Sequence, residues 1–332
     1  MIQQGYPFEN NWYYVTEPRA IASLINNGVK INALIPFWFG VTEQADLIDQ
    51  SDTNTLSITR QIGLPVIPIV HNFASPEYGP LIHRLLTNQY LRRSLVLNIY
   101  NMLISYGFPG VNIDFEFVPP GDRQFMTTFM TELSQVLKPA GLLVTISVPP
   151  ELRDDPAHPF SGAFSYPDLA ENSDQIYVLA YDEHVSQPGP IASIGFVRQV
   201  LSYALSVIPR EKIRLGMAVY GRDWSENTIL PMELSFNEAV NRAAQFGATI
   251  RFDEEAQEPT YTYTENGTRH IVWFENIKSF MTKIHLVLQS GIPGIGVWRL
   301  GLEDVRIWDL VIKALLRHNY TPATACPPNI SK

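Results

Sequence analysis

Cysteine is almost absent from this chain of 332 residues, and its single copy is Cys326, near the C-terminus. One thiol can form neither an intramolecular disulfide nor a cysteine-based metal cluster. The seven histidines show no HExxH pattern and no paired spacing, so the sequence does not indicate a zinc enzyme. We therefore expect no metal and no other cofactor.

Basic residues are outnumbered, and long apolar runs are missing. The 24 Lys and Arg stand against 33 Asp and Glu, which gives a formal net charge of -9. Because phosphate-rich partners need a basic face, this balance argues against nucleic acid and anionic membranes as partners. No apolar stretch approaches membrane-spanning length, and the first residues, MIQQGYPFENNW, do not form a signal peptide. We expect a monomer that is made in the cytoplasm.

Short β-rich apolar runs alternate with amphipathic helical patterns along the chain. In one such helix, Leu91, Leu95, Ile99 and Met102 recur every three or four residues. This alternation is typical of a parallel sheet covered by helices, and eight units close a barrel. We therefore predict an α/β fold, a (β/α)8 TIM barrel. Its candidate strands are residues 12–15, 33–39, 65–71, 110–115, 142–148, 175–181, 213–219 and 294–298.

The interval after the seventh strand is too long for a simple connection. It holds a helical stretch and three strand-like runs, two of them joined by Asn266-Gly267, a pair typical of tight hairpins. We predict a small α+β insertion over residues 223–274 that forms one wall of a cleft. The remainder of residues 1–320 is expected to be a single barrel domain, and residues 321–332 a flexible tail.

Polar side chains gather where the fourth predicted strand ends. Asn112, Asp114 and Glu116 alternate along the chain, so all three point to one side, into the barrel. Function in such barrels lies at the C-terminal ends of the strands. Burying two acids and an amide is costly unless they are bonded or used, and perturbed carboxylates cluster at functional sites. We favour a catalytic site over a polar plug in the core.

Three further strands end in residues suited to sugar binding. The sixth ends in Tyr181 and Asp182, and the seventh leads into Tyr220 and Arg222. The eighth ends in Trp298, whose indole face is a natural floor for a sugar ring, although ordinary core packing would also suit it. The mouth of the barrel is therefore predicted to hold acids, phenols and an aromatic floor together.

These motifs carry a family resemblance. Residues 110–116, GVNIDFE, resemble the DGxDxDxE signature of glycoside hydrolase family 18, the chitinase-like barrels. LAYD at 179–182, YGR at 220–222 and Trp298 resemble that family's motifs on later strands, in the same order. Within the family, HIVWFE and GVWRLGLED look most like the spore peptidoglycan (cortex) hydrolases. The resemblance covers nearly the whole chain and implies an enzyme, a glycosidase.

The resemblance implies a retaining mechanism in which the substrate's own 2-acetamido group attacks the anomeric carbon. Glu116 would be the acid/base, Asp114 would bind the acetamido N–H, and Tyr181 would bind its oxygen. Asp182 would help to position the sugar. The expected substrate-binding residues are Trp298, Asn112, Tyr220 and Arg222.

The expected substrate is a glycan that contains β-linked N-acetylglucosamine, in peptidoglycan of the spore-cortex type, with the enzyme associated with the spore or cell wall. A chitinase and an endo-N-acetylglucosaminidase that cleaves chitobiose remain alternatives. A non-catalytic, chitinase-like sugar-binding protein is an alternative of another class, which the presence of Glu116 disfavours. An unrelated barrel enzyme ranks last, because no glycine-rich phosphate loop follows the seventh or eighth strand.

The sequence departs from the family pattern at three places. Pro109 and Asn112 stand where the signature has its first two aspartates. His71-Asn72-Phe73 stands where a serine-glycine motif is common on the third strand. The two carboxyl groups that the reaction needs most, Asp114 and Glu116, are present.

Overall fold

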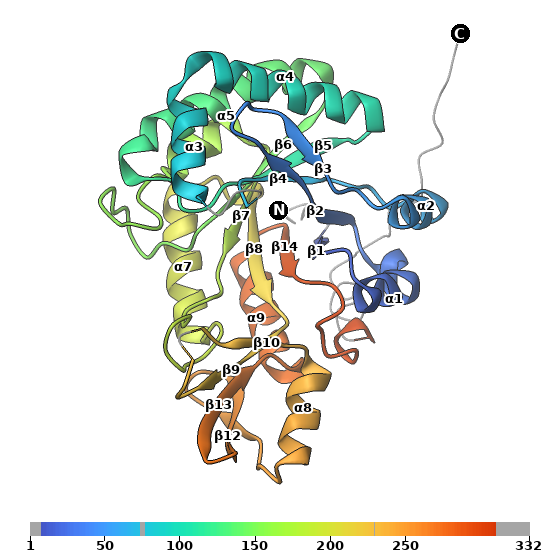
Figure 1. Ribbon diagram of the computed structural model, residues 1–332, viewed down its shortest axis with the longest axis vertical. Helices are drawn as coiled ribbons and strands as arrows, with labels where there is room; N and C mark the ends of the chain where they lie inside the picture. Colours follow the sequence, from blue (N-terminus) through green and yellow to red (C-terminus); the bar gives the residue numbers. More distant parts are fainter. Residues whose placement is uncertain (1–7, 74–76, 229, 310–332) are drawn as a thin grey trace, which may run out of the picture.

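Eight parallel strands form a closed ring in the computed structural model, which describes residues 8–73, 77–228 and 230–309 (Figure 1). β1 pairs with β14 on one side and with β2 on the other, and this double pairing closes the barrel. The predicted (β/α)8 barrel is confirmed, and each candidate strand overlaps an observed one. The ring consists of β1 (Glu9–Tyr14), β2 (Ala33–Val41), β4 (Ile69–His71), β5 (Gly110–Asp114), β6 (Leu143–Val148), β7 (Gln175–Leu179), β8 (Ile213–Ala218) and β14 (Gly294–Trp298).

Helices follow the strands and cover the outside of the ring. α4 shows how the sequence sets their limits: the Asn88 side chain accepts the N–H of Tyr90 at 3.0 Å, and the helix ends where Gly107 takes a φ of 70°. Within the described residues, every helix is too short or too polar to span a membrane. The covering helices are α1 (Pro18–Asn27), α2 (Thr53–Ile62), α3 (Tyr78–Thr87), α4 (Gln89–Tyr106), α5 (Arg123–Leu137), α6 (Tyr166–Asn172), α7 (Ile194–Val207) and α9 (Ile277–Ser290).

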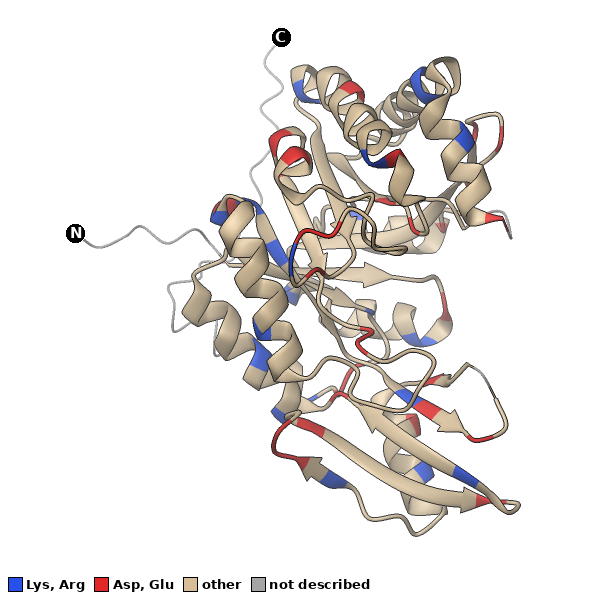
Figure 2. Cartoon of the chain, turned by 90° about the vertical axis from the view of Figure 1, so that its left-hand side faces the viewer, with Lys and Arg blue, Asp and Glu red and all other residues tan. Residues whose placement is uncertain are grey.

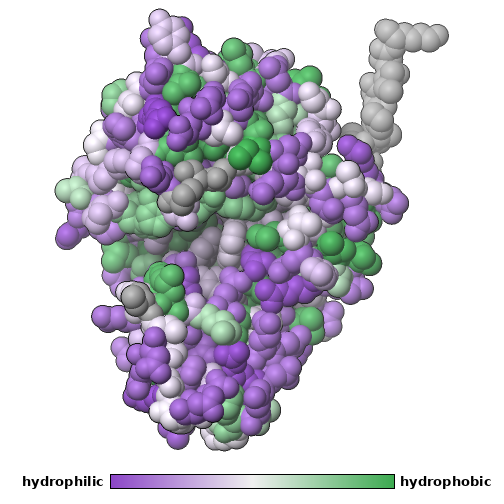
Figure 3. Space-filling model, in the orientation of Figure 1, coloured by the Kyte–Doolittle hydropathy of each residue, from purple (hydrophilic) through white to green (hydrophobic). Residues whose placement is uncertain are grey.

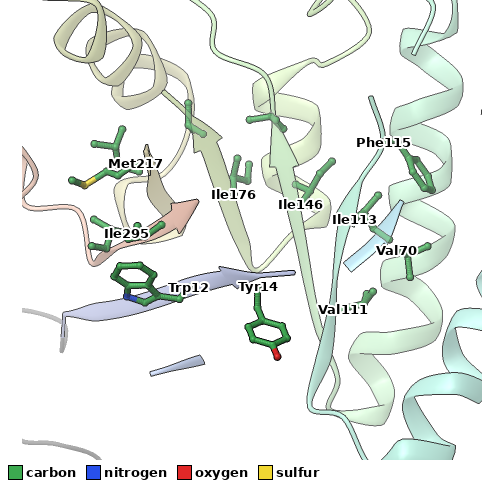
Figure 4. Close-up of a cluster of buried hydrophobic side chains, with 14 of the residues drawn as sticks. Trp12, Tyr14, Val70, Val111, Ile113, Phe115, Ile146, Ile176, Met217 and Ile295 are labelled. Carbon is green, nitrogen blue, oxygen red and sulfur yellow. The ribbon is translucent and has the colours of Figure 1, made fainter. Parts of the chain in front are cut away.

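The core has two parts that differ in chemistry. Outward-facing strand residues such as Val111, Ile113 and Ile146 are fully buried between the ring and the helices (Figure 4). Inward-facing residues are more polar and include Tyr13 and Tyr177, whose rings meet edge to face at 5.9 Å. Because side chains alternate along a strand, this polar interior leads directly to the residues at the strand ends.

The part of the chain between β8 and α9 forms a second, antiparallel sheet. It combines β9 (Gly221–Ser225), β10 (Met232–Leu234), β11 (Arg251–Asp253), β12 (Glu258–Glu265) and β13 (Thr268–Phe274) with helix α8 (Phe236–Gln245). Figure 2 shows charged residues of both signs over this sheet and the helices. A short strand, β3 (Leu47–Asp49), pairs antiparallel with the end of β2. The predicted tail, residues 321–332, and Cys326 lie outside the described residues.

A buried ion cluster joins the second sheet to the barrel. Lys283 on α9 contacts Glu258 on β12 at 2.9 Å and also Glu275, and all three side chains are inaccessible to solvent. Glu258 also accepts the backbone N–H groups of Ile191 and Ala192, each at 2.8 Å, from the loop that follows β7. The second sheet is therefore held to the barrel by charge-assisted bonds.

We expect Lys283→Met to destabilise the fold by about 3–5 kcal/mol, because two carboxyl groups would stay buried without their counter-charge. The free energy of unfolding in urea, followed by circular dichroism, measures this. Lys278→Met on the same helix is the matched control, since Lys278 makes an exposed ion pair with Glu254. That control should cost less than about 1 kcal/mol. Equal losses in the two variants would contradict the prediction.

Candidate active site

A cavity of about 630 Å³ opens at the C-terminal ends of β5, β6, β7 and β14. Figure 3 shows the molecule hollowed in the middle of this face. Asp114, Glu116, Tyr181, Asp182 and Trp298 all line the cavity, so residues from three strand ends meet in one place. A concave site that brings several carboxyl groups together is the first candidate for catalysis.

Asp114 and Glu116 differ in depth but face the same cavity. Asp114 is the last residue of β5 and is 5% exposed, whereas Glu116 lies two residues further along the chain and is half-buried. Burial raises the pKa of both carboxyls, and the nearby charges of Asp114 and Asp182 help to raise the pKa of Glu116 to about 8. Glu116 therefore holds a proton at neutral pH, as a proton donor must.

The backbone of Glu116 is clamped by Asn72, at the end of the neighbouring strand. The Glu116 N–H donates to Asn72 Oδ1 at 2.9 Å, and Asn72 Nδ2 donates to the Glu116 carbonyl oxygen at 2.7 Å. Phe117 then takes a left-handed φ of 55°. These two bonds fix the point from which the Glu116 side chain enters the cavity. Asn72 was not among the predicted site residues.

Tyr181 follows β7 and reaches the cavity past a glycine. A Cβ atom on Gly216 of β8 would lie 2.7 Å from Leu179 Cα and 3.2 Å from the Tyr181 ring, so this position leaves room only for glycine. No hydrogen bond between described residues involves the Tyr181 hydroxyl, and burial raises its pKa well above the ordinary value. The hydroxyl is therefore a neutral donor with no acceptor among the described residues.

Asp182 is held from the side of β8 and β9. Its carboxylate accepts the hydroxyl proton of Tyr220 and forms an ion pair with Arg222 at 2.7 Å. Arg222 also donates to the carbonyl oxygen of His184 at 2.9 Å. Tyr220 and Arg222 do not line the cavity, so the structure places them behind Asp182.

Asn112 lies one layer below the cavity. Its Nδ2 donates to Thr145 Oγ1 at 3.0 Å, and its Oδ1 accepts the hydroxyl of Ser147 at 2.8 Å. The side chain is fully buried and does not line the cavity. The structure therefore separates Asn112 from Asp114 and Glu116 and bonds it inside the barrel.

Aromatic rings surround the cavity. Trp298 packs against Tyr13 with 5.6 Å between ring centroids. At the rim, Phe117 stacks on Tyr78 at 5.6 Å and meets Phe160 edge to face at 5.7 Å. Of the rings that line the cavity here, the sequence predicts Trp298 but not Phe117 or Phe160, because those two lie in loops where no strand pattern marks them.

Glu151 is a further buried acid, which does not line the cavity. It is 4% exposed, neither carboxylate oxygen has a partner among the described residues, and burial raises its pKa to about 8. The described residues contain no group of three or more His, Cys, Asp or Glu arranged to hold a metal ion. Asp114, Glu116, Tyr181 and Asp182 line the cavity, as do Glu183, which is bonded to Ser193, and His158, which is bonded to Ser161.

Comparison with known proteins supports the resemblance. Residues 70–303 match the model of glycosyl hydrolases family 18. The cortical fragment-lytic enzyme of Bacillus subtilis is 29% identical, over 83% of this chain and 66% of that protein. The crystal structure of the Bacillus cereus spore cortex-lytic enzyme SleL superposes with a TM-score of 0.87 at 26% identity, covering 94% of this chain and 75% of that one.

A chitinase is equally similar in structure. The crystal structure of chitinase from Chromobacterium violaceum has a TM-score of 0.86 at 27% identity and covers 93% of this chain and 99% of that one. The chain spans about two thirds of the Bacillus subtilis relative but almost all of this chitinase. From the family match and the fold it follows that this chain belongs to glycoside hydrolase family 18 and is a glycosidase.

Proposed function

We propose that the enzyme cleaves β-linked N-acetylglucosamine in peptidoglycan of the spore-cortex type, by a retaining, substrate-assisted mechanism. The main support is the arrangement of Asp114 and Glu116, two positions apart on one strand end, both in the cavity beside Trp298 and Tyr181. The raised pKa of Glu116 gives it the proton that the leaving group requires.

Glu116 acts first as an acid and then as a base. It protonates the glycosidic oxygen while the 2-acetamido oxygen of the same sugar attacks the anomeric carbon, so the C–O bond to the leaving sugar breaks. The products of this step are the free leaving sugar and an oxazolinium ion. The Glu116 carboxylate then removes a proton from water, which opens the oxazolinium and restores the acid with net retention.

Asp114 and Tyr181 hold the acetamido group. The Asp114 carboxylate accepts its N–H and balances the positive charge of the oxazolinium, and the Tyr181 hydroxyl donates to its oxygen. The unengaged Tyr181 hydroxyl supports this role. Asp182, fixed by Tyr220 and Arg222, positions the sugar ring, and Trp298 forms the floor below it.

In this proposal, Asn112, Tyr220 and Arg222 act on substrate only through other residues. Asn112 supports the strand below Asp114, whereas Tyr220 and Arg222 orient Asp182. The sequence reading placed all three in direct contact with sugar. The cavity geometry favours the indirect role.

The choice of peptidoglycan rests on the relatives. A cortical fragment-lytic enzyme and a spore cortex-lytic enzyme are among the similar proteins, and we infer from them a spore-associated glycan and location. Chitin is the second candidate substrate, because the Chromobacterium violaceum chitinase is matched over 99% of its length.

Digestion of defined substrates tests the proposal. Muropeptide fragments from spore cortex and oligomers of N-acetylglucosamine are incubated with the enzyme, and the products are identified by mass spectrometry. We expect new N-acetylglucosamine reducing ends from cortex fragments, first released as the β-anomer in a proton NMR time course. Cleavage of the oligomers alone would favour the chitinase. Binding without cleavage of either substrate would show a sugar-binding protein and contradict the proposal.

The proposal also predicts how the rate depends on pH. Glu116 works as an acid only while protonated, so kcat/KM should fall about tenfold per pH unit above its pKa of about 8. Asp114 works as an anion, so the rate should also fall at low pH as that carboxyl gains a proton. Glu151→Gln is the matched control, because Glu151 has the same raised pKa outside the cavity. If that variant lost the alkaline limb, the assignment to Glu116 would be wrong.

A further inference from the structure

His71 lies beside Asp114 across two neighbouring strands. In the pairing of β4 with β5, Ile69 is opposite Asn112 and His71 is opposite Asp114. Adjacent strands are about 4.8 Å apart, and alternate side chains share one face. Ile69 packs inside the barrel, so His71, two positions along, also faces inward, at the level of Asp114.

The His71 ring is fixed by packing. It stacks on Phe37 with 3.8 Å between ring centroids and an angle of 11° between the ring planes. Phe37 in turn meets Trp298 edge to face at 6.2 Å. His71 is only 3% exposed, so its orientation is set by the aromatic floor of the site rather than by solvent.

The hydrogen bonds of His71 determine which ring nitrogen carries the proton. The backbone N–H of Phe73 donates to His71 Nδ1 at 3.2 Å, so Nδ1 presents its lone pair. Burial lowers the pKa of His71 to about 4, so the ring is neutral and its proton is on Nε2. His71 Nε2 has no hydrogen-bond partner among the described residues. A buried donor without an acceptor is rare in folded proteins and requires a reason.

Few of the groups that face Asp114 can donate a hydrogen bond to its carboxylate. The groups that face it are Tyr13 from β1, His71 from β4, Glu116 from its own strand end, and Tyr181 and Asp182 from beyond β7, and none is a cation at neutral pH.

The Tyr13 hydroxyl is already engaged. Ser147 donates to Asn112 Oδ1 at 2.8 Å, so Tyr13 must be the donor in its own 2.8 Å bond to Ser147. In the proposed mechanism Tyr181 donates to the substrate, and the Glu116 proton goes to the glycosidic oxygen, so neither donor is kept for Asp114. His71 Nε2–H is the donor that remains within the described part of the barrel mouth.

We propose that His71 is a positioning residue for Asp114: its Nε2–H donates a hydrogen bond to the Asp114 carboxylate when that group is ionised. This inference rests on the proposed function, in which Asp114 works as an anion. The neutral imidazole lowers the cost of that anion without adding a positive charge that would oppose the oxazolinium ion. Because Nε2 has no partner in the structure, the ionised carboxylate forms this bond by turning toward β4, which leaves its second oxygen for the acetamido N–H.

Two substitutions of His71 distinguish the effect of its hydrogen-bond donor from the effect of its ring packing. His71→Phe keeps a ring against Phe37 and removes the donor, whereas His71→Gln keeps an N–H at the same reach. The pKa of Asp114 is measured by NMR on protein labelled with ¹³C at the aspartate carboxyl, and its signal is assigned by its loss in Asp114→Asn. Losing the donor destabilises the carboxylate, so we expect His71→Phe to raise the Asp114 pKa by about 0.5–1 unit. His71→Gln should restore at least half of that shift.

The matched control is His83→Phe, which removes a half-exposed histidine bonded to Asp122 and should leave the Asp114 pKa unchanged. An unshifted Asp114 pKa in His71→Phe would overturn the proposal. Equal shifts in the Phe and Gln variants would also overturn it, because they would indicate packing alone. If His71→Phe does not fold, His71→Met replaces it, since it also lacks a donor. The titration needs no substrate, so it decides the role of His71 even if the glycans are not cleaved.

Discussion

Glu116→Gln should lower kcat on N-acetylglucosamine oligomers or cortex fragments by at least about 10³-fold while the fold is retained. Glutamine has nearly the same shape but no acidic proton, so the leaving oxygen would depart as an unprotonated alkoxide. The clamp between Asn72 and residue 116 uses only backbone atoms of the latter, so it survives the substitution. Turnover under saturating substrate and the Kd for a non-hydrolysed oligomer separate lost chemistry from lost binding.

Stability provides an independent check on the same variant. A carboxyl whose pKa is raised by folding destabilises the fold once the pH exceeds its unfolded value of about 4.3, because the folded state then resists ionisation. Glu116→Gln removes this penalty. Its melting temperature should therefore exceed that of the parent protein increasingly as the pH rises from about 5 to about 8, the pKa of Glu116 in the folded state, and the difference should level off above that pH. A near-normal rate, or a melting temperature that falls with rising pH relative to the parent, would refute the assignment of Glu116.

Asp114→Asn should lower kcat by about 10²-fold or more, with a smaller change in KM. The amide keeps the volume of the side chain but cannot carry the negative charge that balances the oxazolinium ion. Because that charge develops only as the reaction proceeds, its loss should affect the chemical step more than binding. Steady-state kinetics on a soluble oligomer gives kcat and KM separately.

The residual activity of Asp114→Asn should also show a shifted pH profile. The Asp114 charge helps to raise the pKa of Glu116, so removing that charge lowers the pKa and moves the alkaline limb to lower pH. Asp182→Asn is the graded control, because Asp182 raises the same pKa by a smaller amount. An alkaline limb that stays in place in Asp114→Asn would show that the two carboxyls do not act on one another.

Most of the barrel could be predicted because its strands are buried on both faces. Such strands appear in the sequence as short continuous apolar runs, and all eight were found in this way. The sequence does not predict β3, β9 or β10. β9 reads GRDWS, and its charges are satisfied only by distant partners, such as Arg242 and His270 around Asp223. A local hydrophobic pattern does not show bonds of that kind.

The sequence predicts the side to which the candidate site residues point, but not how deep in the barrel each one lies. Side-chain alternation indicates that Asn112, Asp114 and Glu116 face the same side, and the structure places Asn112 inside the barrel and the two carboxyls in the cavity at its mouth. The alternation of side chains does not predict which of these residues reaches the cavity and which stays in the packed interior of the barrel. Asn112 is one layer too low to reach the cavity, and Tyr220 and Arg222 lie behind Asp182.

Asn72 could not have been recognised from the sequence as the residue that holds Glu116. Its role depends on contact between Asn72 and Glu116, which follow two neighbouring strands and are 44 positions apart in the sequence. His71 was noticed only as a departure from the family pattern, and its unpartnered nitrogen is visible only in three dimensions.

The position of β1 in the ring sets a condition on how the protein can be made. β1 begins at residue 9, but one of its two neighbours, β14, begins at residue 294. During synthesis from the N-terminus, the first strand therefore has an unpaired edge until almost the whole barrel has been translated. The barrel therefore cannot close during translation of the earlier strands. The pairing of β1 with β14 forms only after β14 has left the ribosome.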